Sequence, residues 1–247
     1  MCEWCGCGQD EHDGKHDVKK IELNQSLMAE NDRIARGNKR HIEALGAVGI
    51  NLISSPGAGK TTLLEATINQ LKKRFKIGVI EGDIETERDA DRIRRKGVPV
   101  VQLTTGGACH LDANIVHKGL HHLEEHTDGT GLDIVFIENV GNLVCPASFY
   151  LGEHKRVVLV SVPEGSDKPA KYPKAFISSD LFVVTKTDLL DYFDFSLDEA
   201  KSEALRLNPS LELMYLSSTT GNGMDKWISY LTDMVENNRA MSGKDAV

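Results

Sequence analysis

A glycine-rich segment, residues 54–61 (SSPGAGKT), carries the clearest chemistry in this sequence. An apolar run precedes it and an amphipathic run follows it, so the segment lies where a buried strand turns into a helix. Glycine lets the backbone approach phosphate oxygens closely, and the N–H groups at a helix N-terminus attract negative charge. Lys60 adds a point charge and Thr61 a hydroxyl for Mg²⁺, which predicts a phosphate-binding loop even though Ser54 replaces the usual first glycine. The residues expected to contact phosphate are Pro56, Gly57, Ala58, Gly59, Lys60, Thr61 and Thr62.

Two acidic residues lie at or near the ends of apolar runs that are typical of strands. Asp83 ends the run 76–83 and is a candidate for Mg²⁺ or its water shell, because ligands of parallel sheets bind at the carboxyl edge. A cap for the following helix is the competing explanation. Gly141 follows Glu138 by three residues, which lets the acid hold the Mg²⁺ water shell while the glycine N–H senses a γ-phosphate. The expected catalytic residues are Lys60, Thr61, Asp83 and Glu138.

A further polar segment, residues 185–188 (TKTD), follows another apolar run. The Asp188 carboxylate can accept from both N1–H and the exocyclic amine of guanine, a pair that adenine does not present. The stem of Lys186 can lie along the base, and Thr185 stands where the usual pattern has asparagine. The segment therefore predicts binding of GTP and GDP rather than ATP. The residues expected around the guanine are Lys186, Asp188, Ser217 and Ser218.

Thiol and imidazole groups occur on two loops expected at the same edge of the sheet. Cys109 and His110 follow a glycine pair and can offer a thiolate and an imidazole to one metal ion. Cys145 lies four residues beyond Gly141, so a loop that moves when the γ-phosphate leaves would carry Cys145 with it. Metal binding by these three residues can therefore depend on the bound nucleotide. The competing explanations are an incidental Cys-His pair and a buried Cys145 that packs as a small hydrophobe.

Three of the five cysteines crowd into the first seven residues, a pattern that indicates metal binding in a reducing compartment. Gly6 permits a tight turn that lets the thiols converge on one ion. If Met1 is removed, the free amine of Cys2 is a possible fourth ligand, and soft thiolates together with an amine nitrogen suit Zn²⁺ or Ni²⁺. The alternative is a disordered acidic tail with incidental cysteines. The candidate ligands are Cys2, Cys5 and Cys7, with His12 and His16 as weaker ones.

The composition is that of one α/β domain with an appendage: 247 residues, of which 40% are hydrophobic and 27% charged. A formal net charge of −8 provides no general attraction to nucleic acid or to an anionic membrane. No apolar run approaches the ~18 residues of a membrane span, and the N-terminus lacks the apolar region of a signal peptide. We expect a cytoplasmic protein that binds neither nucleic acid nor membrane.

Seven short apolar runs are expected to form a mostly parallel sheet flanked by helices, an α/β fold of the P-loop NTPase class. The charged helix before the first strand is expected to break near Gly37-Asn38, and the histidines that follow His110 are interpreted as surface residues. Residues 85–96 and 224–237 are expected helices, the first an arginine-rich solvated face. The expected units are a metal-binding tail 1–17, a helical segment 18–45, a P-loop GTPase domain 46–238 and a disordered tail 239–247. The expected strands are 48–53, 76–83, 98–103, 133–140, 157–162, 180–185 and 211–216.

Four motifs together resemble the hydrogenase nickel incorporation GTPases, the HypB family, within the dimerising P-loop GTPases. The motifs are SPGAGKT at 55–61, GACH at 107–110, ENVGNLVCP at 138–146 and the opening CEWCGC at 2–7. The resemblance implies GTP hydrolysis coupled to delivery of Ni²⁺ into the large subunit of [NiFe] hydrogenase, with a small zinc-containing partner chaperone.

The resemblance further implies a GTP-dependent homodimer. It makes Cys109, His110 and Cys145 a nucleotide-controlled Ni²⁺/Zn²⁺ site at the dimer interface, and the N-terminal cysteines a separate high-affinity nickel site. Many relatives carry a long histidine-rich tract after that start, whereas this chain has only His12 and His16.

The expected reaction is in-line attack of water on the γ-phosphate, with the loop amides, Lys60 and Mg²⁺ neutralising the developing charge. Lys168 is a further candidate for phosphate contact across the dimer. No catalytic base is evident in the sequence, so slow intrinsic turnover is expected. The alternatives are a urease-type nickel chaperone GTPase and a metal-storage or sensor protein with a regulatory nucleotide site. An ATP-driven enzyme is disfavoured by Asp188.

Overall fold

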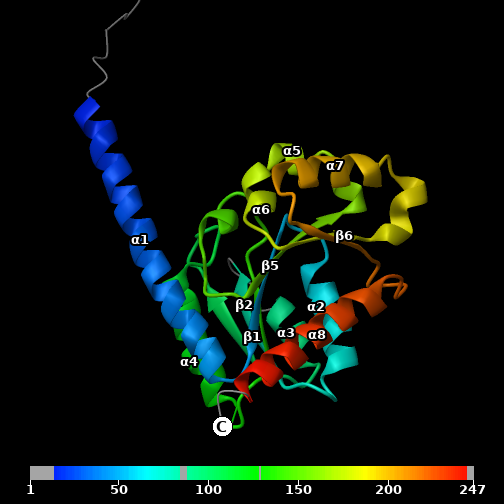
Figure 1. The fold of residues 1–247 in the computed structure, drawn as a ribbon, viewed down its shortest axis with the longest axis horizontal. Coiled ribbons are helices and arrows are strands. Elements are labelled where there is room, and N and C mark those ends of the chain that lie inside the picture. The colour runs from blue at the N-terminus through cyan, green and yellow to red at the C-terminus, as the bar shows by residue number, and fades with distance from the viewer. Residues whose placement is uncertain (1–13, 84–87, 128, 244–247) are drawn as a thin grey trace, which may run out of the picture.

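The computed structural model describes residues 14–83, 88–127 and 129–243. At its centre is a seven-stranded sheet in the order β3-β2-β4-β1-β5-β6-β7, and every recorded strand pair is parallel (Figure 1). The predicted α/β class is confirmed, and the strand ends differ from the expected ones by no more than two residues. The strands are β1 (Val48–Ser54), β2 (Ile77–Asp83), β3 (Val100–Thr104), β4 (Ile134–Glu138), β5 (Lys155–Ser161), β6 (Leu181–Thr185) and β7 (Glu212–Tyr215).

Helices cover both faces of the sheet, which is why its strands are apolar on both sides. Alternate residues of β4 illustrate this: Ile134 and Phe136 join one core cluster, whereas Val135 and Ile137 join another. The first face packs against α2 and α8, and the other face against α1 with α4 at one end and α6 with α7 at the other (Figure 1). The helices are α1 (Gly14–Ala44), α2 (Lys60–Leu71), α3 (Arg88–Arg94), α4 (Ala113–Glu125), α5 (Lys168–Lys171), α6 (Pro173–Ile177), α7 (Leu197–Leu207) and α8 (Met224–Ser242).

Helix α1 is continuous, so the predicted break near Gly37-Asn38 is wrong. The physical reason is tertiary packing against α4 and the loop before β5. The buried Asn38 amide donates to Ala113 O at 2.7 Å and to Leu151 O at 3.0 Å. These contacts outweigh the cost of about 1 kcal/mol that a glycine imposes on a helix interior. The helix also begins four residues earlier than the expected residue 18.

Helix α8 ends at Ser242 rather than near residue 237, so the prediction of a disordered tail from residue 239 is wrong for residues 239–242. Arg239 explains the extension, because its guanidinium donates twice to Asp133 Oδ1, at 2.6 and 3.1 Å, in the loop before β4. Within the described residues, no helix is long and apolar enough to cross a membrane.

Trp227 anchors α8 to α2 and provides a test of this packing. Its ring is fully buried, and Nε1 donates to Thr67 Oγ1 at 2.8 Å, while that hydroxyl donates to Leu63 O at 2.7 Å. Trp227→Phe should lower the free energy of unfolding by about 1–3 kcal/mol, because the buried Thr67 oxygen loses its donor. Urea denaturation measures this change. In the Thr67→Val background the same substitution should cost less, and equal costs in the two backgrounds would contradict a contribution from this hydrogen bond.

Candidate nucleotide and metal sites

The glycine-rich loop connects β1 to α2, as predicted. Gly57 and Gly59 adopt φ values of 75° and 95°, a region that other L-residues rarely occupy, and Gly59 caps the N-terminus of α2. The N–H groups of the first turn therefore remain available to an anion. Lys60 is buried and donates to Ser54 Oγ at 2.8 Å, so the serine at the position of the usual first glycine holds the lysine across the mouth of the loop. Burial lowers the pKa of Lys60.

Two carboxylates face this loop from adjacent strands. Thr61 Oγ1 donates to Glu138 Oε1 at 2.7 Å, and Glu81 of β2 lies opposite Glu138 in the strand register. Burial raises the pKa of Glu138 to about 6. Burial, and then the negative charges of Glu138 and Asp83, raise the pKa of Glu81 to about 8. Within the part of the chain that the structure describes, one oxygen of each glutamate is buried without a hydrogen-bond partner, a cost that a cationic or donating ligand would remove.

Glu81 was not predicted, although a carboxylate in an apolar strand is a signal the sequence does contain. Arg92 of α3 was also missed, because its arginine-rich helix was interpreted as a solvated face. Arg92 instead donates to Asp89 Oδ1 at 2.9 Å and to Glu65 Oε2 at 2.5 Å. It lines the same cavity of about 410 Å³ as the phosphate loop. The same cavity is lined by nine of the residues predicted to bind the nucleotide or Mg²⁺: Pro56, Gly57, Gly59, Lys60, Thr61, Thr62, Asp83, Glu138 and Gly141.

A second cavity, of about 190 Å³, adjoins the first and shares Gly59, Thr62 and Lys186 with it. Lys186 has a left-handed backbone (φ 56°), and its Nζ donates to Gly57 O at 2.7 Å. Thr185, at the usual asparagine position, donates to Ala58 O at 2.6 Å and so ties β6 to the phosphate loop. The structure thus places the predicted base-binding segment directly beside the phosphate-binding segment. The predicted guanine contacts Lys186, Asp188, Ser217 and Ser218 all line this second cavity.

The structure brings Cys109, His110 and Cys145 together, with their ligand atoms within 4.8 Å of one another. The two sulfur atoms are 2.8 Å apart and the cysteines are free, while Cys109 Sγ lies 3.9 Å from His110 Nδ1. The ring of Phe149 stacks on His110 with centroids 4.1 Å apart, which orients the imidazole. Hydrogen bonding to Cys109 raises the pKa of Cys145, and burial lowers the pKa of His110. Two thiols and a neutral imidazole form a ligand set typical of Zn²⁺ or Ni²⁺.

Gly141 connects the nucleotide site to this cluster. A Cβ added at Gly141 would lie 3.0 Å from Pro56 Cα, so the loop after β4 passes against the phosphate loop with no space for a side chain. The same loop continues to Cys145, and Asn142 Nδ2 donates to Cys109 O at 3.4 Å. One short segment therefore contacts the phosphate loop at one end and contributes a thiol at the other.

Other predicted site residues are not brought to these cavities. Lys168 lines neither of them in the single chain, and its Nζ lies 3.7 Å from Glu164 Oε1. The N-terminal candidates Cys2, Cys5, Cys7 and His12 lie outside the described residues, as does the side chain of His16.

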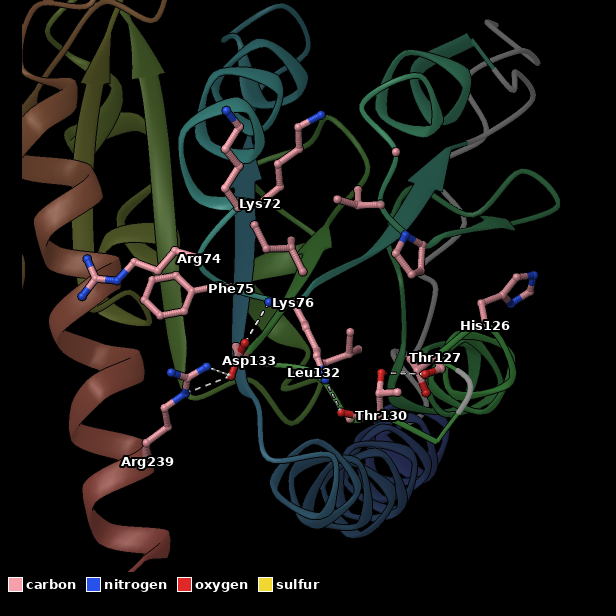
Figure 2. A pocket seen from close by; sticks show the side chains of 16 residues that line it. Lys72, Arg74, Phe75, Lys76, His126, Thr127, Thr130, Leu132, Asp133 and Arg239 are labelled. Atoms are coloured by element: carbon pink, nitrogen blue, oxygen red, sulfur yellow. Dashed lines mark hydrogen bonds and ion pairs between the residues drawn. The ribbon is translucent and has the colours of Figure 1, made fainter.

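A further cavity, of about 540 Å³, lies away from the phosphate loop (Figure 2). Several of its basic side chains already have protein partners: Lys76 Nζ donates to Thr130 O at 2.9 Å, and Arg239 pairs with Asp133 (Figure 2). Lys72 Nζ donates to Lys96 O at 2.7 Å near the end of α2. These contacts satisfy carbonyl groups at the edge opposite the phosphate loop, so we assign this cavity a structural role.

Comparison with known proteins agrees with this geometry. The model of the CobW/HypB/UreG nucleotide-binding domain matches residues 49–215. The hydrogenase maturation factor HypB of Azotobacter vinelandii is 45% identical over 218 residues, which cover 88% of this chain and 71% of that protein. The hydrogenase/urease maturation factor HypB of Helicobacter hepaticus is 42% identical over 224 residues, covering 91% and 90%.

Among solved structures, the crystal structure of HypB from Helicobacter pylori in complex with nickel has a TM-score of 0.81 and 39% identity, covering 85% of this chain and 96% of that one. The shared fold is that of a P-loop NTPase. The chain therefore belongs to the HypB hydrogenase maturation factors of the CobW/HypB/UreG nucleotide-binding family.

Proposed function

We propose that this protein is a GTPase that couples GTP hydrolysis to the delivery of nickel during maturation of [NiFe] hydrogenase. The observation that carries the proposal is the segment from Gly141 to Cys145, which touches the phosphate loop and also supplies a thiol to the Cys109–His110–Cys145 cluster. A change at the γ-phosphate can therefore reach the metal ligands through a few residues of backbone.

In the nucleotide site, each group has a role that follows from its position. The N–H groups of the loop and the Lys60 ammonium bind the phosphates and favour the charge that develops as water attacks the γ-phosphate in line. The Lys60 ammonium donates a hydrogen bond to the neutral Ser54 hydroxyl. When nucleotide binds, it can donate to phosphate oxygens instead. Asp188 reads the guanine, and Lys186 covers one side of the base. No general base is assigned, so we expect slow intrinsic turnover.

The residues beside the loop also fit Mg²⁺, an ion that prefers oxygen ligands. The Thr61 hydroxyl lies next to Glu138, and the unpartnered oxygens of Glu138 and Glu81 leave two carboxylates to hold the ion or its water shell. Asp83, at the end of β2, lines the same cavity. When bound, Mg²⁺ supplies neutralisation of charge on the phosphate oxygens. Thr61, Asp83 and Glu138 would hold the ion beside the loop formed by residues 56–62.

The metal ion is the cargo of the second site. Zn–S bonds of about 2.3 Å place two thiolates about 3.8 Å apart around a tetrahedral ion, further than the 2.8 Å between the sulfurs of Cys109 and Cys145. Binding therefore requires the two sulfur atoms to separate, by rotation of the cysteine side chains or by movement of the loops, and a nucleotide-dependent shift at Gly141 can favour or oppose that separation. Val144, next to Cys145, is 58% exposed. The site lies at a GTP-dependent homodimer interface in this proposal, where the partner can complete the coordination.

The remaining parts of the proposal concern regions and partners beyond these two sites. Residues 1–17 form a metal-binding tail in which Cys2, Cys5 and Cys7 bind nickel, and residues 46–238 form the GTPase domain. The ion is received from, or passed to, a small zinc-containing partner chaperone and reaches the hydrogenase large subunit. This exchange takes place in the cytoplasm, where reducing conditions keep the thiols free.

The test removes the N-terminal cysteines, so that metal binding reports on the Cys109–His110–Cys145 cluster, and then varies only the bound nucleotide. In a Cys2/Cys5/Cys7→Ala variant, Ni²⁺ affinity should differ at least about tenfold between the GDP form and a form with a non-hydrolysable GTP analogue, because a coupling of about 1.4 kcal/mol is typical of switches. Competition with a chelator measures the affinity. Cys145→Ala should weaken binding and remove the difference. Equal affinities in the two nucleotide states would leave two independent sites and refute the coupling.

A urease-type role is the second candidate, favoured by the hydrogenase/urease name of the Helicobacter hepaticus relative. The site chemistry is the same for both roles, because only the acceptor of the ion differs. Deleting the gene and assaying both enzymes with and without added nickel separates them. Loss of hydrogenase activity alone supports the first role, and loss of urease activity alone supports the second.

A further inference from the structure

Three histidines converge between two helices at a place that the nucleotide and thiol sites do not use. His41 comes from the last turn of α1, and His117 and His121 are one turn apart on α4. Their ligand atoms all lie within 4.8 Å of one another. The ring centroids are 4.8 Å apart for His41 and His121, and 4.7 Å apart for His117 and His121. Figure 1 shows α1 and α4 side by side, so the cluster depends on the packing of these helices.

Hydrogen bonds prepare His117 to bind a metal ion. Both amide protons of the buried Asn38 side chain are directed to carbonyl oxygens, those of Ala113 and Leu151, which leaves Oδ1 as an acceptor. This oxygen lies 3.1 Å from His117 Nδ1, so the ring proton belongs on Nδ1 and the Nε2 lone pair is free. A ring N–H that donates to a fixed oxygen is the usual support of a metal-ligating histidine.

His41 has a comparable support from a carboxylate. Its Nε2 lies 3.0 Å from Glu124 Oε2, so Nε2 donates to the carboxylate and Nδ1 carries the free lone pair. Glu124 also places a negative charge and an oxygen ligand beside the three rings. Burial, together with the neighbouring imidazoles of His121 and His41, lowers the pKa of His117.

His121 completes the arrangement and leaves it open to solvent. Its side chain is exposed, whereas His41 and His117 are partly buried, so an ion can enter from the His121 side and retain a water ligand. Zn–N bonds of about 2.0–2.1 Å place the nitrogens of a tetrahedral site about 3.4 Å apart. A rotation of the exposed His121 ring is the movement that closes the set around an ion.

We propose that His41, His117 and His121, with Glu124 beside them, form a further metal site that binds a divalent transition ion such as Zn²⁺ or Ni²⁺ through imidazole nitrogen. Without thiolates, it favours ions that imidazole suits and disfavours Mg²⁺ and Ca²⁺. The bound ion links α1 to α4, the helix that begins three residues after His110. The site does not rest on the proposed GTPase function, because none of its ligands lines the nucleotide cavities.

The experiment removes every thiol from the full chain and asks whether metal binding survives. In a variant with all five cysteines replaced by serine, competition between Zn²⁺ and a chromogenic chelator should show about one ion bound per chain. His121→Ala in this background should lower the affinity at least about tenfold, since even the loss of a supporting partner costs 10- to 100-fold. His122→Ala is the matched control, because this exposed neighbour pairs with Glu125 outside the cluster.

Thermal unfolding provides a readout that also verifies folding. Zn²⁺ should raise the unfolding temperature of the thiol-free chain and of its His122→Ala variant, and should leave that of the His121→Ala variant unchanged. His121 is exposed, so its replacement is not expected to disturb the fold. Absence of Zn²⁺ binding by the thiol-free chain would overturn the proposal. So would binding that persists in His121→Ala but is lost when His12 and His16 are replaced.

Discussion

Replacing Asp188 with asparagine should weaken GTP binding by about 100- to 1,000-fold and create affinity for xanthosine triphosphate. In the proposed site the carboxylate would accept from guanine N1–H and from the exocyclic amine, whereas an asparagine amide can accept from only one of these and presents its own N–H₂ to the other. Xanthine carries a carbonyl oxygen in place of that amine, so the asparagine amide matches it. Asp188 lines the cavity beside Lys186, which positions it for this contact.

Competition between a fluorescent guanine nucleotide and unlabelled GTP, ATP or xanthosine triphosphate measures the change in preference. Asp191→Asn is the matched control, because Asp191 lies in the same 3-10 helix, Thr187–Tyr192, is exposed and lines neither cavity. The control should retain the affinity of the parent chain for GTP. If Asp188→Asn bound GTP as tightly as the parent, Asp188 would not be the residue that reads the base.

Lys60→Ala should reduce single-turnover GTP hydrolysis by about 100- to 1,000-fold, the effect of removing one preorganised charge from a phosphoryl-transfer site. The ammonium is buried at the N-terminus of α2, donates to the neutral Ser54 hydroxyl and lies in the field of the Glu138 and Glu81 carboxyl groups, so its charge acts in a weakly screened environment. The same substitution should abolish any difference in Ni²⁺ affinity between nucleotide states, because the γ-phosphate would no longer be held against Gly141.

Lys73→Ala, an exposed substitution just after the opposite end of α2, controls for a general loss of positive charge. Hydrolysis should be followed at saturating GTP, and nucleotide affinity measured separately, so that loss of binding is distinguished from loss of catalysis. Urea unfolding of both variants verifies the fold. Hydrolysis by Lys60→Ala at the parental rate would refute the role assigned to this lysine.

The sequence predicted those site residues that lie close together along the chain. The phosphate loop from Pro56 to Thr62 is one strand-to-helix connection, and its chemistry depends on glycine, lysine and threonine at fixed spacing. Lys186 and Asp188 are likewise two residues apart. Local backbone geometry determines such segments, so residue type and spacing were sufficient to propose these residues, which the structure places around two adjoining cavities.

Residues whose role depends on neighbours far along the chain were missed or misread. Glu81 is significant because strand register places it opposite Glu138. Arg92 was interpreted as a solvated residue, but it lines the cavity because α3 packs beside α2 and Arg92 donates to Glu65. The predicted break at Gly37 was wrong because the propensity of a single glycine is small compared with the buried contacts of Asn38.

The sequence by itself determined the strand-helix pattern, and it predicted the candidate phosphate loop, the candidate guanine-binding segment and the candidate ligands Cys109, His110 and Cys145. Apolar periodicity and local turn chemistry depend on residues that are close together in the sequence, so both can be recognised from the sequence alone. Only the tertiary structure decided which of these segments touch: that Gly141 passes against Pro56, that two thiols meet across two loops, and that His41 reaches the histidines of α4. Such contacts depend on the order of parallel strands and the packing of helices over them, which no short stretch of sequence encodes.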